Sequence, residues 1–86
     1  MEFLIIAFRS REESVKFSRL LNKYGVSSSL SAPPKEAGLS CGLSVRTEIN
    51  YFYAVKNLLS SIKTKTFVGV FKVKTLNGRN VVTTIY

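Results

Sequence analysis

The sequence predicts an α+β domain, a ferredoxin-like βαββαβ sandwich with an extra C-terminal hairpin strand. Three observations lead to this fold class: the order of strand-like and helix-like segments, a capped amphipathic helix after the first apolar run, and an Asn-Gly turn signal near the C-terminus. With 86 residues the chain can bury one modest core. We therefore expect a single domain over residues 1–86, with its core at about residues 2–74 and the hairpin strand at about 79–86.

The first quarter of the chain is expected to form a buried strand and then a helix. Glu2–Phe8 is a continuous apolar run, typical of a central strand buried on both faces. Ser10 and Glu13 match a capping box, in which each side chain bonds the other residue's amide, and this predicts a helix over Arg11–Tyr24. Gly25 stands where a C-terminal cap is expected. The apolar face of this helix consists of Phe17, Leu20, Leu21 and Tyr24.

The later elements follow from shorter patterns, and Asn77-Gly78 predicts the turn of a final hairpin. Alternation along the fourth strand predicts that Val70 points outward and Phe71 inward. In the expected topology the first and third strands are central and antiparallel, both helices cover one face, and the last strand extends the edge beside the fourth. The predicted elements are an edge strand at Val26–Ala32, a strand at Leu43–Thr47, a helix at Glu48–Lys63, and strands at Thr66–Lys74 and Val81–Tyr86.

Charge and composition restrict the classes of function that this chain can have. The net charge is +8, from 13 basic and 5 acidic residues, which favours anionic partners such as nucleic acid, phosphorylated molecules or an acidic protein face; a solvated surface is the other interpretation. With no histidine and one cysteine, the chain offers no internal disulfide, zinc site or Cys-His catalytic couple. We expect no cofactor and no self-contained enzyme. The chain shows neither a secretion signal nor a membrane span, so we expect a cytoplasmic protein.

Cys41 is the residue with the most chemical potential, because it lies between Ser40 and Gly42 in a turn-like segment. The expected topology brings three basic stretches to one end of the sheet, where a helix N-terminus adds partial positive charge. Such surroundings activate an exposed thiol, whereas a buried Cys41 would be a core filler. The three stretches are Arg9-Ser10-Arg11, the segment from Lys35 to Gly42, and Lys63-Thr64-Lys65.

Residues 33–46 resemble the signature of the selenium/sulfur (Se/S) carrier protein-like family of small bacterial proteins. The signature has a proline, a charged pair, Ser-Cys-Gly, two aliphatic positions and a basic residue, and the resemblance covers about residues 3–70. It implies that Cys41 accepts sulfur or selenium from a donor, for example a cysteine desulfurase-type enzyme, and hands it on as a persulfide-type adduct. It also implies that Ser40 and Gly42 shape the turn and that Arg46 assists anion or partner binding. The extra hairpin and the high positive charge depart from the usual pattern.

A different class of function stays open: a basic binding module for nucleic acid or protein, in which Cys41 is structural. The strand Val70–Lys74 mixes aromatic and basic residues, as in sheets that stack bases, but the RNP1 pattern is absent and Phe71 is expected in the core. The open sheet face could instead form a homodimer. Candidate residues for that contact are Val68, Val70, Val82 and Thr84.

Overall fold

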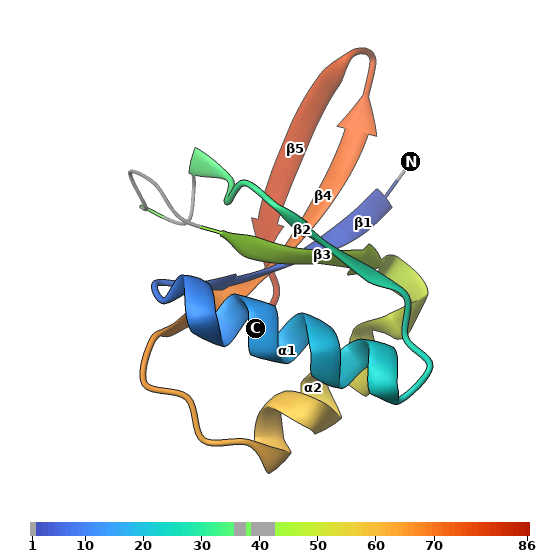
Figure 1. Ribbon diagram of the computed structural model, residues 1–86. Helices are drawn as coiled ribbons and strands as arrows, with labels where there is room; N and C mark the ends of the chain where they lie inside the picture. Colours follow the sequence, from blue (N-terminus) through green and yellow to red (C-terminus); the bar gives the residue numbers. More distant parts are fainter. Residues whose placement is uncertain (1, 36–37, 39–42) are drawn as a thin grey trace.

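The computed structural model describes residues 2–35, 38 and 43–86, which form a single antiparallel sheet of five strands and two α-helices (Figure 1). The fold is therefore of the mixed α+β class that the sequence predicts. In chain order the elements are β1 (Glu2–Phe8), α1 (Arg11–Lys23), β2 (Ser28–Ser31), β3 (Ser44–Glu48), a 3-10 turn η2 (Ile49–Tyr51), α2 (Phe52–Ser61), β4 (Phe67–Leu76) and β5 (Arg79–Thr84).

The strands lie in the order β2-β3-β1-β4-β5, with every neighbouring pair antiparallel. The central strand β1 pairs on one side with β3 and on the other with β4, so that Ile5 lies between Arg46 and Phe71. The expected antiparallel contact of the first and third strands is confirmed, and β5 extends the edge beside β4 as expected. The sheet thus brings the first and last thirds of the chain together.

The start of α1 is capped differently from the prediction. The Ser10 hydroxyl accepts from the Glu13 amide at 3.3 Å, which confirms one half of the capping box. The reciprocal half is wrong, because Thr66 occupies the place between the two groups. The Ser10 amide donates to Thr66 Oγ1 at 3.2 Å, and Thr66 Oγ1 donates to the Glu13 carboxylate at 2.8 Å. A residue from the other end of the chain therefore completes the helix cap.

The end of α1 follows from Gly25, whose φ of +80° lies in the left-handed region. The Gly25 amide donates to Asn22 O at 3.1 Å and the Val26 amide to Leu21 O at 2.9 Å, the pair of bonds that defines a Schellman motif. This turn directs Val26 into the core. Tyr24 was expected on the apolar helix face but is 63% exposed, because the helix ends there and Val26 takes the core position.

Side chains from both helices pack on one face of the sheet, as expected (Figure 1). Val70 belongs to this buried cluster, so its predicted outward orientation is wrong. Alternation along a strand does not reveal which face is solvated when apolar residues cover both. The buried residues under the helices are Leu4, Ile6, Phe8, Phe17, Leu21, Val26, Val45, Val55, Leu59 and Val70, and the smaller cluster on the other face contains Ile5, Ala7, Phe71 and Val73.

The second helix is shorter than the predicted span Glu48–Lys63. The chain leaves β3 through η2, at whose start Glu48 makes no side-chain capping bond, and the α-helix begins only at Phe52. Its expected apolar stripe is confirmed, with Val55 and Leu59 buried against the sheet and Ile62 packed beside them. The helix thus completes the core and directs residues 62–66 back toward the start of α1.

Candidate functional site

The candidate site lies where the start of α1, the beginning of β3 and the connection from α2 to β4 meet. The Arg9 amide donates to Thr66 O at 2.8 Å, which joins the end of β1 to this connection. The hydroxyl of Ser14, a fully buried residue, donates to Leu43 O at 2.6 Å. Leu43 stands two residues after Cys41 in the sequence, so α1 fixes the point where the cysteine-bearing segment enters β3.

Cys41 lies outside the described residues, as do its neighbours Ser40 and Gly42. Of the three basic stretches expected at one end of the sheet, the structure brings together Arg9-Ser10-Arg11 and Lys63-Thr64-Lys65, while most of the third, Lys35 to Gly42, lies outside the described residues. The activation of the Cys41 thiol stays a prediction.

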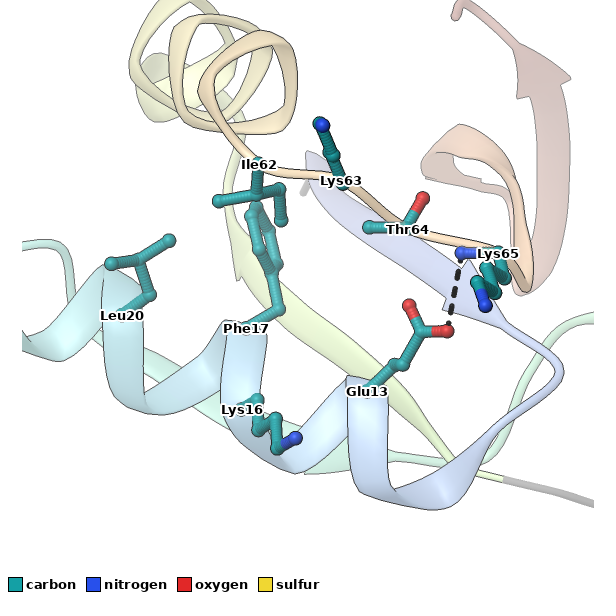
Figure 2. A pocket seen from close by; sticks show the side chains of 8 residues that line it. All are labelled: Glu13, Lys16, Phe17, Leu20, Ile62, Lys63, Thr64 and Lys65. Atoms are coloured by element: carbon teal, nitrogen blue, oxygen red, sulfur yellow. Dashed lines mark hydrogen bonds between the residues drawn. The ribbon is translucent and has the colours of Figure 1, made fainter.

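Glu13 connects the two sides of the site. Its Oε1 atom accepts from the Lys65 amide at 3.3 Å, drawn as a dashed line in Figure 2, and from Thr66 Oγ1 at 2.8 Å. Both bonds span more than 50 residues of sequence. A carboxylate that accepts two hydrogen bonds near a helix N-terminus is well placed, because the helix dipole favours negative charge there. The α2–β4 connection is thereby held against the first turn of α1.

A groove of about 480 Å³ opens between α1 and this connection. Figure 2 shows Phe17 and Ile62 close together at its apolar floor with Leu20 beside them, while Lys16 and Lys63 lie on opposite sides. We call this the basic groove. Its lining residues are Glu13, Lys16, Phe17, Leu20, Ile62, Lys63, Thr64 and Lys65.

A second hollow, of about 400 Å³, lies on the other side of Lys16, which lines both. Leu43 lines this second hollow. The two hollows together therefore extend across the surface of α1, from residues 62–65 to the start of β3. Five cations surround the pair of hollows, together with the carboxylates of Glu12 and Glu13. The cations are Arg11, Lys16, Arg19, Lys63 and Lys65.

The predicted supporting residues fall in different places. Arg9 and Arg11 are exposed at the start of α1, and Ser10 is its N-cap. Lys35 is exposed beyond the end of β2, where its carbonyl accepts from the Gly38 amide at 3.0 Å. Arg46 points to the face opposite the helices, and its guanidinium carbon lies 3.8 Å from the centre of the Phe3 ring, a cation–π contact. The site at the start of α1 thus contains three of these five residues.

The face opposite the helices gives little support to base stacking. Phe71 is only 3% exposed, so it is buried as expected, but it lies on the face opposite the helices, and its predicted inward orientation is wrong, as is the outward orientation predicted for Val70. Its buried ring offers no platform for a base. Of the suggested dimer residues, Val68 and Val82 pack half-buried on this face and Thr84 is exposed. Val70 was wrong as a candidate, because it lies under the helices.

Residues 2–35, 38 and 43–86 contain neither a metal-binding cluster nor a membrane-spanning helix. No group of three or more acidic, histidine or cysteine side chains in these ranges could hold a metal ion. In the same part of the chain, no helix combines the length and apolar character needed to cross a bilayer.

The match with a known family covers most of this architecture. A family model described as "Putative Se/S carrier protein-like" matches residues 3–67. The chain belongs to this family. The matched region extends from β1 through α2, includes the segment with Cys41, and ends at the first residue of β4. No curated protein and no solved structure matches the chain.

Sequence reasoning missed two residues that organise the site, Ser14 and Thr66. A signal for Ser14 existed, because Ser14 and Ser18 are small polar residues beside the apolar positions Phe17 and Leu21. Small polar residues on a buried helix face need hydrogen-bond partners, and they find them in neighbouring strands. Thr66 gave no comparable signal, since its partners Ser10 and Glu13 are more than 50 residues away in the sequence.

Proposed function

We propose that this protein is a carrier of sulfur or selenium, and that the thiol of Cys41 accepts the transferred atom. The family match over residues 3–67 carries the proposal, because it includes the chain's one cysteine. We also infer that β2-β3-β1-β4 and the two helices correspond to a ferredoxin-like sandwich, to which β5 is added at the edge.

The transfer step is a thiol–disulfide-type exchange. The Cys41 thiolate attacks the outer sulfur of a donor persulfide, R–S–SH. A new S–S bond forms at Cys41 as the donor's S–S bond breaks, so Cys41 becomes a persulfide and the donor leaves as the thiolate R–S⁻. An acceptor nucleophile then attacks the same outer sulfur and releases Cys41 as a thiolate. A selenium atom in the outer position follows the same course.

The surroundings of the segment support this step. Thiolates are stabilised by nearby positive charge, and Arg11, at the positive end of the α1 dipole, lines the same hollow as the anchored residue Leu43. The chain has no second cysteine that could attack a Cys41 persulfide from within. The outer atom must therefore pass to another molecule, as a carrier requires.

The test is sulfur loading followed by transfer. Purified protein is incubated with a cysteine desulfurase and cysteine, and intact mass spectrometry then measures the gain of one sulfur atom. We expect the unsubstituted chain to gain this atom and Cys41→Ser to gain none. The loaded protein should lose the atom to a small-molecule thiol, since the adduct is a persulfide.

The matched control is Ser60→Ala, which keeps the thiol, removes an exposed hydroxyl on α2 and should still load. If Cys41→Ser gains sulfur as well as the unsubstituted chain does, the carrier mechanism is wrong and Cys41 is structural. Alkylation of Cys41 across pH adds a readout that needs no enzyme. Reaction of the folded protein at neutral pH supports an exposed, active thiol, whereas reaction only after unfolding contradicts it.

A further inference from the structure

The basic groove has the properties of a docking site for a protein segment. We propose that it binds an acidic segment with an apolar side chain, supplied by the protein that exchanges sulfur or selenium with this chain. The role of that partner rests on the proposed function, whereas the binding itself can be tested separately.

Charge is the first argument for an acidic ligand. Lys16, Lys63 and Lys65 surround the groove, and all three are exposed. In the part of the chain that the structure describes, no carboxylate lies within ion-pair distance of these three ammonium groups. Glu13 is the acidic residue of the lining, and its Oε1 is already occupied by Lys65 N and Thr66 Oγ1. Three positive groups are thus available to an incoming carboxylate.

The floor of the groove argues for a protein ligand over nucleic acid. The half-buried side chains of Leu20 and Ile62 lie over the Phe17 ring and provide an apolar surface on which an aliphatic or aromatic side chain can pack. Phe17 is buried beneath the floor, so its ring does not offer the exposed face that a stacked base needs. A segment with one apolar side chain flanked by carboxylates would match both the apolar floor and the lysines around it.

The position of the groove connects docking with the cysteine-bearing segment. Glu13 lines the groove, while the next residue, Ser14, holds Leu43 by the 2.6 Å bond. Lys16 lines both the groove and the hollow that Leu43 borders. A partner bound in the groove would therefore contact the same two turns of α1 that anchor the start of β3.

The binding experiment uses three fluorescent probes of similar length at low salt. One is a peptide of glutamates and leucines, the second has the same charge with serine in place of leucine, and the third is a single-stranded oligonucleotide. We expect the Glu/Leu peptide to bind most tightly, with an affinity that falls as salt is added. Amide NMR shifts should concentrate at residues 13–20 and 62–65.

Charge reversal in the groove should weaken binding, and matched reversals elsewhere should not. We expect Lys63→Glu to reduce the affinity for the Glu/Leu peptide about threefold, and Lys16→Glu with Lys63→Glu about tenfold, from the size of exposed ion pairs. The controls are Arg79→Glu on the β4–β5 hairpin, and Arg79→Glu with Lys56→Glu, which change the net charge equally. The substituted side chains are exposed, and circular dichroism should show that every variant keeps its fold.

Three results would overturn the proposal. The groove is not the site if the control reversals weaken binding as much as the groove reversals do. The apolar floor plays no part if the Glu/Leu and Glu/Ser peptides bind equally. A protein partner is the wrong class if the oligonucleotide binds more tightly than either peptide.

The experiment also separates the two proposals. Cys41→Ser should bind the Glu/Leu peptide as the unsubstituted chain does, because the proposed contacts are made by residues 13–20 and 62–65. If the unsubstituted chain binds the peptide but gains no sulfur, the carrier mechanism alone is contradicted. The other possible outcome is that the variant with Lys16→Glu and Lys63→Glu gains sulfur from the desulfurase, and transfers it to an acceptor, at the same rates as the unsubstituted chain. This outcome would leave the carrier function in place and reject the groove as the docking site.

Discussion

The two ends of the β1–β4 pair are held by different kinds of contact. At the α1 end, hydrogen bonds join residues far apart in sequence, as between Ser14 and Leu43 or Glu13 and Thr66. At the other end, the β4–β5 hairpin projects beyond the helices, and its turn is formed by Asn77 and Gly78 (Figure 1). Leu76, just before the turn, is 47% exposed.

The two ends should therefore respond differently to substitution. Local turn chemistry and the strand ladder hold the hairpin, so a substitution there acts on few partners and costs little. The α1 end depends on tertiary contacts, and removing one leaves a buried partner unsatisfied or a cavity in the core. Substitutions of similar size should therefore destabilise the α1 end more than the hairpin end.

The largest effect is expected from Phe8→Ala at the α1 end. Phe8 is fully buried, and its ring centre lies 5.6 Å from that of Phe17 and 5.7 Å from that of Phe67. Removing the ring should lower the free energy of unfolding by about 3–5 kcal/mol through lost burial and a cavity. Urea denaturation measures this loss. Leu76→Ala, at the exposed hairpin end, is the comparison, and an equal loss there would contradict the contrast between the ends.

Ser14→Ala should cost about 1–3 kcal/mol, because it leaves the Leu43 carbonyl without its hydroxyl partner at a buried position. Hydrogen exchange should also show less protection of the amides at the start of β3. The matched control is Ser60→Ala, which removes an exposed hydroxyl bonded to Lys56 O at 3.0 Å. Similar losses from the two variants would mean that the bond to Leu43 O contributes nothing special.

Thr66→Val should lower stability by about 1–2 kcal/mol. The substitution keeps the shape of the side chain but removes the hydroxyl that accepts from the Ser10 amide and donates to Glu13. Thermal unfolding with Thr66→Ser as the control tests the role of the hydroxyl, since serine retains it. If the serine variant is destabilised as much as the valine variant, the missing methyl group and not the hydrogen bonds explains the loss.

The smallest of these effects is expected in the hairpin turn. Gly78 has a φ of +78°, and an added Cβ would meet nothing within 4 Å, so the cost of Gly78→Ala comes from the backbone alone. We expect about 1 kcal/mol from urea denaturation. Asn77→Gly should be close to neutral, because the φ of 49° at Asn77 suits glycine. A loss from Gly78→Ala larger than that from Ser14→Ala would reverse the ranking of the two ends.

The local elements of this fold could be predicted from the sequence because their causes are local. The serine N-cap and Gly25 fix the ends of α1 within one or two residues, and Asn77-Gly78 fixes the final turn. The second helix was harder, since no capping side chain marks where the α-helix begins. The solvated side of β4 was mistaken because apolar residues cover both faces of the sheet.

The candidate site also combines features that can be predicted from the sequence with features that cannot. The sequence contains the one cysteine, the excess of positive charge and the order of elements that brings distant basic stretches together. Three features arise only in the folded molecule: Thr66 completes the cap of α1, Ser14 holds Leu43, and three lysines surround an apolar groove. Pattern and turn chemistry act over a few residues, whereas these contacts join groups separated by 29 to 56 positions. Their geometry exists only after the sheet and helices have packed.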